Sequence, residues 1–326
     1  MGKNIVICCD GTGNEYGKNN TNVVAMYTPI IRDAAQMAYY DPGVGTFSVL
    51  GRTLGKKIGI IMGNAFGYGL QANIEDAYEY LMNRYEPGDR LFLFGFSRGA
   101  FTVRALAGML HKVGILQKGS KNLIPYASRI YNTHGNDDIA AGFKATYSHE
   151  CKPHFIGVWD TVASLGLFYG KKFFNARLNP DVTHSYHAIA IDEKRKKFPV
   201  SLWDESSRTP DQTIEQVWFA GVHSDVGGSY EQRGLSNIAL MWMLTVAEMN
   251  GLRLNKNWKE HIHPDPLDEL HNSRTGLWRL WPTVTRTIPE NAKIHESVLV
   301  RKKAMENYTP ALPNNYKEVK TPMVAE

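Results

Sequence analysis

A serine, an aspartate and a histidine each stand where an apolar run of the sequence ends. Ser97, Asp160 and His223 follow the runs LFLF, FIGVW and QVWFAG. If these runs are parallel strands, their carboxyl ends form one edge of a sheet, where open α/β folds bind ligands. A serine hydroxyl becomes an effective nucleophile when a base takes its proton and an acid orients that base. The three residues therefore predict attack on an ester, with Ser97 as nucleophile, His223 as base and Asp160 as orienting acid.

The residues around Ser97 predict a sharp turn between a strand and a helix. Ser97 is the centre of Gly-Phe-Ser-Arg-Gly, and the following segment has apolar or small residues at positions 101, 105, 106, 109, 110 and 113. That spacing is helical, and a strand, G-x-S-x-G and a helix in succession are typical of a nucleophile elbow. The glycines leave room for the reversal, and the residue at its tip is often forced to a positive φ.

Backbone N–H groups near Ser97 are expected to hold the negative oxygen that forms during attack on an ester. The N–H of Arg98 begins the predicted helix, where free N–H groups and the helix dipole favour an anion. A glycine-rich turn, DGTGN, follows the strand predicted at 4–9. This turn could donate the N–H of Gly11 or of Thr12 to the same oxygen.

A second set of catalytic residues is left open by the sequence. Ser97, Asp225 and His295 also occur in the chain order nucleophile, acid, histidine. This set needs a final strand before His295, so the first set is preferred because its strands are clearer. In the preferred set, Asp225 caps the glycine turn beside His223.

Asp10 and Asp225 lie in turns at the same predicted edge and are candidates for substrate binding. Their carboxylates could instead bind a divalent cation in a metal-assisted phosphoesterase, since hard oxygen ligands suit Mg²⁺ and Ca²⁺. Their spacing carries no metal-loop signature, so neither a metal nor a cofactor is expected. A non-catalytic binding protein on a hydrolase fold is the remaining alternative, and the presence of a residue for each catalytic role argues against it.

Strands and helices alternate along the predicted chain. Strands are expected at 4–9, 37–40, 91–94, 155–159 and 216–221, and helices at 23–37, 72–84, 101–113, 126–131 and 237–250, the last capped by Ser236. The alternation predicts an α/β-hydrolase-like, doubly wound, mainly parallel sheet with helices on both faces, as a single domain over residues 1–326. Residues 164–210 are a candidate lid or insertion, and an irregular tail is expected from about residue 303.

The composition is that of a folded soluble protein, with 43% hydrophobic and 21% charged residues. The sequence has no apolar run of about eighteen residues, and its start lacks the long hydrophobic segment of a cleaved signal peptide. Its three cysteines form neither a disulfide framework nor a metal-ligand spacing. These features predict synthesis in the cytoplasm.

The net charge of +5 includes two basic clusters, at 194–197 and 301–303. Both clusters are candidates for transient contact with an anionic membrane surface or phosphate, although solvated surface is the preferred interpretation. No nucleic-acid partner is expected, and the sequence leaves the oligomeric state open.

Several blocks of the sequence resemble one protein family. They are DGTGN, GFSRGAFTVRALAGMLHKVGIL, GVWDTV and VWFAGVHSDVGGSY, followed by GLSNIALMWML and IHESVLVR. Together they are similar to the catalytic domain of type VI secretion phospholipase effectors, also described as an uncharacterised α/β-hydrolase domain, over residues 3–302. The resemblance implies a Ser-Asp-His esterase of lipids or other acyl esters, exported by a type VI-like system. Matched to the family's motifs, Ser97 is the nucleophile, Asp160 the acid and His223 the base.

Overall fold

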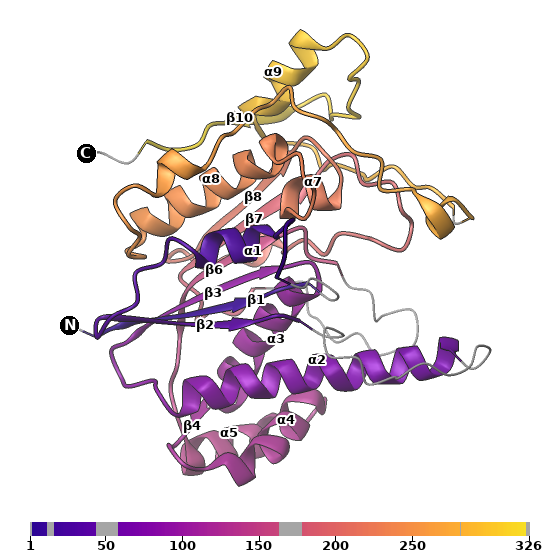
Figure 1. Ribbon diagram of the computed structural model, residues 1–326. Coiled ribbons are helices and arrows are strands. Elements are labelled where there is room, and N and C mark those ends of the chain that lie inside the picture. The colour runs from indigo at the N-terminus through magenta and orange to yellow at the C-terminus, as the bar shows by residue number, and fades with distance from the viewer. Residues whose placement is uncertain (1, 12–15, 44–57, 163–177, 281, 324–326) are drawn as a thin grey trace.

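An eight-stranded sheet forms the centre of the protein. The computed structural model describes residues 2–11, 16–43, 58–162, 178–280 and 282–323 (Figure 1). Across the sheet the strand order is β10, β9, β8, β7, β6, β3, β1, β2, and every neighbouring pair is parallel. The bounds are β1 Asn4–Cys9, β2 Gln36–Asp41, β3 Arg90–Phe96, β6 Pro153–Trp159, β7 His184–Ala190, β8 Thr213–Phe219, β9 Ala292–His295 and β10 Tyr316–Val319. A separate antiparallel pair joins β4 Ile115–Leu116 and β5 Ser148–His149.

The central strands are apolar because both of their faces are buried. In β1, Ile5 and Ile7 pack into one hydrophobic core, while Val6 and Cys8 pack into the other. Successive side chains of a strand point to opposite faces of its sheet, so a strand covered on both sides reads as a continuous apolar run.

Helices cover both faces of the sheet, which confirms the predicted α/β-hydrolase-like, doubly wound fold (Figure 1). One core is closed by α2 Ile58–Met82, α3 Arg98–Val113, α4 Ile124–Asn132 and α5 Asp137–Tyr147. The opposite core is closed by α1 Asn22–Tyr27, α7 His223–Gly227 and α8 Gly234–Met249. Helix α9, Glu296–Ala304, directly follows β9. Among the described residues, no helix is both long enough and apolar enough to cross a membrane.

The first helix is shorter than predicted. Helix α1 ends at Tyr27 and does not reach Met37, because Pro29 has no backbone N–H with which to continue the helical hydrogen bonds. The chain then enters β2 at Gln36.

Helix α8 starts earlier than predicted. Its first residue is Gly234, and the N–H of Gly234 donates to Oδ2 of Asp268 at 2.6 Å. Ser236, the predicted cap, lies inside the helix and donates its hydroxyl to the carbonyl oxygen of Arg233. The capping carboxylate therefore comes from a distant part of the chain.

Two segments predicted to be irregular contribute strands to the sheet. Strand β7 lies within the candidate lid at 164–210, between β6 and β8, and residues 164–177 of that segment are outside the described structure. Strand β10 lies within the tail predicted from about residue 303 and pairs with β9. The sheet is consequently wider on this side than the sequence indicated.

Candidate active site

Ser97 occupies the tight turn between β3 and α3. Its backbone has φ 56° and ψ −118°, a left-handed conformation that non-glycine residues seldom adopt. The two glycines of the motif are needed for packing. A Cβ at Gly99 would lie 2.1 Å from the carbonyl oxygen of Cys9 in β1, and a Cβ at Gly95 would lie 2.5 Å from that of Gly99. The turn therefore has the geometry predicted for a nucleophile elbow.

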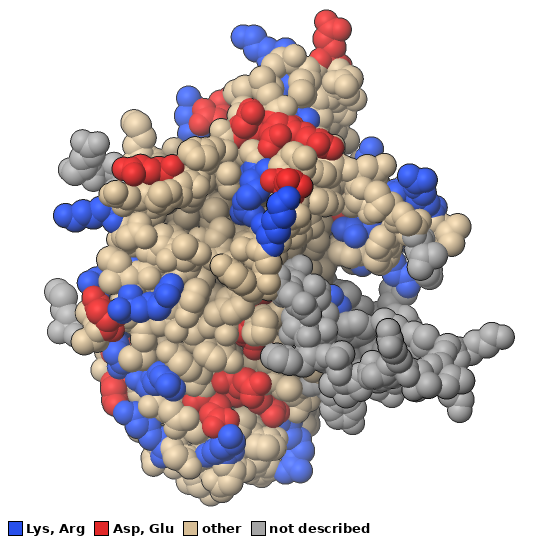
Figure 2. Space-filling model, in the orientation of Figure 1, with Lys and Arg blue, Asp and Glu red and all other residues tan. Residues whose placement is uncertain are grey.

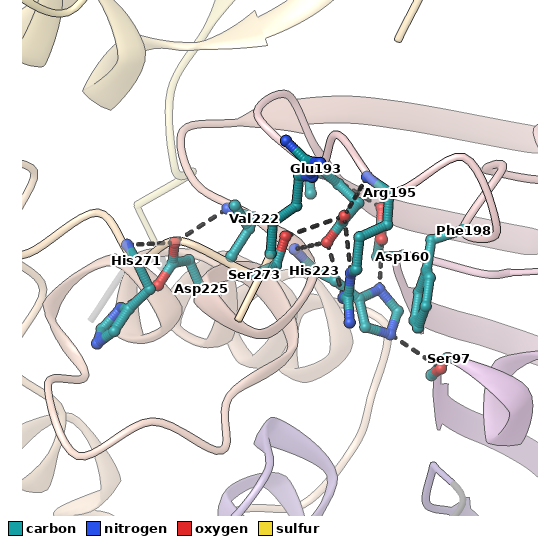
Figure 3. Close-up of polar contacts among 12 residues, drawn as sticks. Ser97, Asp160, Glu193, Arg195, Phe198, Val222, His223, Asp225, His271 and Ser273 are labelled. Carbon is teal, nitrogen blue, oxygen red and sulfur yellow. Dashed lines mark hydrogen bonds and ion pairs between the residues drawn. The ribbon is translucent and has the colours of Figure 1, made fainter. Parts of the chain in front are cut away.

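Ser97, His223 and Asp160 form a chain of hydrogen bonds (Figure 3). The Oγ of Ser97 is 2.9 Å from Nε2 of His223, and Nδ1 of His223 is 2.5 Å from Oδ2 of Asp160. The three residues are 7%, 5% and 0% exposed, respectively. Burial excludes water that would compete for these hydrogen bonds and strengthens their electrostatics.

These three residues do not follow three adjacent strands of the sheet. Asp160 follows β6, but His223 begins α7 after β8, and β7 lies between those two strands. The backbone at Asp160 has a positive φ of 37°, and its N–H donates to the carbonyl oxygen of Ala188 in β7 at 2.8 Å. The backbone of Asp160 is thus hydrogen-bonded to β7, the strand that separates it from the end of β8, where His223 lies.

Two aromatic rings hold the imidazole of His223. The ring of Phe96, next to Ser97, is 4.6 Å from it between centroids, and the ring of Phe198 meets it edge-on at 5.1 Å. Phe96 is itself backed by Gly227, because a Cβ at Gly227 would lie 2.0 Å from the Phe96 ring. The imidazole is therefore oriented by packing as well as by its hydrogen bonds.

Asp160 has a second partner, the cation Arg286, that the sequence did not indicate. Its guanidinium is bidentate, with Nη1 2.5 Å from Oδ1 and Nη2 2.9 Å from Oδ2 of Asp160, and both side chains are almost fully buried. Burial alone would raise the pKa of Asp160, but the positive charge of Arg286 and the hydrogen bond from His223 outweigh it and hold that pKa well below its usual range. Asp160 is therefore ionised and can only accept hydrogen bonds.

A second buried carboxylate, Glu193, braces the backbone of His223. Its Oε2 accepts the N–H of His223 at 3.3 Å, and its Oε1 accepts the hydroxyl of Ser273 at 3.0 Å. Arg195 pairs with Glu193 through its own side chain (Figure 3). Burial raises the pKa of Glu193, but the hydrogen bond and charge of Arg195 outweigh it and leave that pKa below its usual range. The sequence analysis missed Glu193. One local pattern could have indicated it, because the apolar run AIAI is followed directly by Asp-Glu, as at the end of a buried strand.

The sequence matches a known family over three quarters of its length. Residues 3–246 fit the family described as "T6SS, Phospholipase effector Tle1-like, catalytic domain". The chain belongs to this family. Membership confirms the resemblance seen in the sequence blocks. Ser97, Asp160 and His223 lie within the matched range, whereas Ser273 and Arg286 lie beyond it.

Two further proteins are similar to this chain. "Uncharacterized protein YEL023C" of Saccharomyces cerevisiae is 35% identical over 218 residues, which are 60% of this chain and 32% of the yeast protein. The chain therefore spans about a third of that relative's length. A crystal structure of an uncharacterized protein from Pseudomonas aeruginosa is 19% identical, with a TM-score of 0.49, over 81% of this chain and 49% of that one.

The residues of the alternative set have other partners in the structure. Oδ1 of Asp225 is 2.6 Å from Nδ1 of His271, and Oδ2 accepts the N–H of Val222 at 3.0 Å. His295 contacts Ser297 and Thr321 through its two ring nitrogens. Asp225 therefore caps the turn before His223, as expected for the preferred set, and points away from Ser97 (Figure 3).

The glycine-rich turn after β1 is held by Asp10. Oδ2 of Asp10 accepts the hydroxyls of Thr21 at 2.6 Å and Tyr40 at 2.9 Å, and Oδ1 accepts the N–H of Gly11 at 2.6 Å. Gly11, one candidate oxyanion donor, thus gives its N–H to Asp10. Thr12, the other candidate, lies outside the described residues.

Asp10 and Asp225 are also the candidate ligands for a divalent cation. Each carboxylate already accepts at least two protein hydrogen bonds. Within the described ranges, no group of three or more His, Cys, Asp or Glu side chains is arranged to hold a metal ion. The geometry around both residues is that of turn-stabilising carboxylates.

Proposed function

We propose that the protein is a serine esterase of lipids, of the phospholipase A type, with Ser97 as nucleophile. The observation that carries this proposal is the buried chain of hydrogen bonds from Ser97 through His223 to Asp160. Family membership supports the lipid substrate and export by a type VI system. The turn conformation of Ser97 supports its role, because strain of this kind is found at nucleophile elbows.

The protonation states needed for attack follow from the charge on Asp160. An ionised carboxylate only accepts hydrogen bonds, so Nδ1 of His223 carries the proton that lies between them. Nε2 is then a lone-pair acceptor facing the hydroxyl of Ser97. In this arrangement His223 acts as a general base at the start of the reaction.

The reaction proceeds in two halves. Ser97 Oγ bonds to the ester carbonyl carbon while its proton moves to Nε2 of His223. The tetrahedral intermediate collapses, the ester bond breaks, and the proton passes from Nε2 to the leaving alcohol oxygen. Water then gives a proton to Nε2 and attacks the acyl-enzyme, which releases the fatty acid and returns the proton to Ser97.

The negative oxygen of each intermediate needs preorganised donors. The N–H of Arg98, at the first residue of α3, is proposed as one donor because N–H groups in the first helical turn point out of the helix. The second donor is proposed to be the N–H of Thr12. Loss of one donor in such a hole typically slows turnover about 100-fold or more.

Arg286 and Glu193 are proposed to position the catalytic groups without touching the ester. Arg286 fixes both oxygens of Asp160, so that one of them faces Nδ1 of His223. Glu193 fixes the backbone of His223 at the start of α7. Such supporting contacts hold a base in its productive orientation.

A panel of lipid and soluble acyl esters tests this function. Wild type should release fatty acid from phospholipids, and Ser97→Ala and His223→Ala should lose at least about 1,000-fold in kcat, the range seen when a triad residue is removed. His295→Ala is the matched control and should keep wild-type kcat. Equal loss in His295→Ala, or full activity in Ser97→Ala, would overturn the assignment.

A further inference from the structure

Two basic segments lie side by side near the proposed active site. The N–H of Val284 donates to the carbonyl oxygen of Lys194 at 2.9 Å, and Arg195 forms an antiparallel bridge with Thr283. We call residues 194–197, 274–280 and 282–284 the tip. Its short helical turn, Gly276–Leu280, projects from the body of the protein at the right of Figure 1.

The tip exposes large apolar side chains. Leu280 is 81% exposed and Val284 is 45% exposed. Isolated apolar residues on a surface need no explanation. These two differ because they lie within four residues of each other on a projection that is otherwise basic. A strongly charged surface that also carries exposed leucine is the pattern of protein segments that bind at a lipid interface.

The charge of the tip has one sign. The tip contains six Lys and Arg residues and no Asp or Glu. One of the six, Arg195, is paired with Glu193, while Lys194, Lys196 and Arg279 are exposed. In Figure 2, Lys and Arg atoms are gathered on this projection. The surface is therefore complementary to an anionic partner.

Aromatic rings connect the tip with the proposed base. The ring of Trp278, in the tip, meets the ring of Phe198 edge-on at 5.4 Å, and Phe198 in turn packs against His223. The guanidinium of Arg195 lies 3.6 Å from the centre of the Phe198 ring. A membrane seated on the tip would therefore lie beside the catalytic edge of the sheet.

We propose that the tip docks the enzyme on an anionic lipid surface, with Leu280 and Val284 inserted among the lipids and Lys194, Lys196 and Arg279 on their phosphates. The apolar pair supplies insertion and the cations supply attraction to anionic head groups. The proposal rests on the proposed lipid esterase, because it assigns the surface that presents the substrate. Of the two basic clusters that were candidates for membrane contact, the proposal selects the one at 194–197.

Vesicle binding by the inactive variant Ser97→Ala tests the tip separately from catalysis. Ser97→Ala should sediment with vesicles of phosphatidylcholine mixed with phosphatidylglycerol, and much less with phosphatidylcholine alone. Adding Arg279→Glu should weaken binding about 30-fold, or about 2 kcal/mol, because charge reversal removes one attraction and adds one repulsion. Adding Leu280→Asp should weaken it at least about tenfold.

Matched controls come from α9, where Val300 is 47% exposed beside the second basic cluster. Lys302→Glu and Val300→Asp should leave vesicle binding unchanged. On the active background, Arg279→Glu and Leu280→Asp should keep hydrolysis of a soluble ester and lose hydrolysis of vesicle phospholipid. The proposal that the tip docks on lipid would be overturned by unchanged vesicle binding in both tip variants. Equal loss of binding in the α9 variants, or no binding by Ser97→Ala, would overturn it as well. Soluble-ester hydrolysis that does not need Ser97 would instead overturn the proposed function.

Discussion

Replacing Arg286 with methionine removes a permanent positive charge that bonds both carboxylate oxygens of Asp160. That charge opposes protonation of the imidazole on the same carboxylate. We expect kcat/KM of Arg286→Met to fall off at higher pH than in wild type, because the protonated, inactive form of the base becomes easier to reach. We also expect lower stability, since Asp160 loses a buried cationic partner.

The size of the effect follows from the geometry. Nη2 of Arg286 and Nδ1 of His223 bond the same oxygen of Asp160, at 2.9 and 2.5 Å. Two charges about 5 Å apart, at an effective dielectric constant of about 20, interact by about 3 kcal/mol, which corresponds to about two pH units. Removing one partner of a buried pair typically lowers the free energy of unfolding by about 3 kcal/mol or more.

The assay is the pH dependence of kcat/KM on a soluble ester, together with urea unfolding. Arg286→Lys should shift the acidic limb much less, because it keeps the charge. Arg301→Met is the matched control, since Arg301 is also buried but donates to the carbonyl oxygens of Pro266 and Asp268. It should lose stability and keep the wild-type pH profile. An unshifted acidic limb in folded Arg286→Met would refute the reasoning.

Two other substitutions test the surroundings of the site. Burial raises the pKa of Asp41 from 3.8 to about 6, so the folded protein binds this proton more tightly than the unfolded chain does. The resulting gain in the free energy of unfolding is present below about pH 4 and is lost as the pH rises through 6. Asp41→Asn should lack this loss of about 3 kcal/mol in urea unfolding between these pH values, and a slope equal to wild type would contradict it. Gly227→Ala places a Cβ 2.0 Å from the Phe96 ring that packs on His223. It should lower Tm, with a cost of about 1–3 kcal/mol, and reduce ester hydrolysis; unchanged Tm and kcat would argue against this packing.

The central strands were predictable because their environment is uniform. Strands β1, β3 and β6 are covered on both faces, so burial leaves a continuous apolar run in the sequence. Strand β7 was missed because its first four residues read His-Ser-Tyr-His, and only its last three residues are an apolar run. Strand β10 was missed because it lies at the edge of the sheet with mostly exposed side chains. Such a strand is determined by its pairing with β9, which no local pattern records.

Some residues of the candidate site were likewise predictable from local sequence, and others were not. Ser97 and His223 lie in glycine-rich motifs at the ends of apolar runs, so local spacing alone indicated them. Arg286 lies in a segment without regular secondary structure or a periodic pattern, and its partner Asp160 is 126 positions away in the chain. A contact of that kind is set by tertiary packing. A lone arginine in such a segment reads as solvated surface until the structure is known.

Active-site labelling tests the central claim, that His223 activates Ser97, most directly. A fluorophosphonate should react with folded wild type at a single serine, identified by peptide mass as Ser97. The labelling rate should fall at least about 1,000-fold in His223→Ala and stay at the wild-type value in His295→Ala. Label on another serine, or undiminished labelling of Ser97 in His223→Ala, would contradict the account.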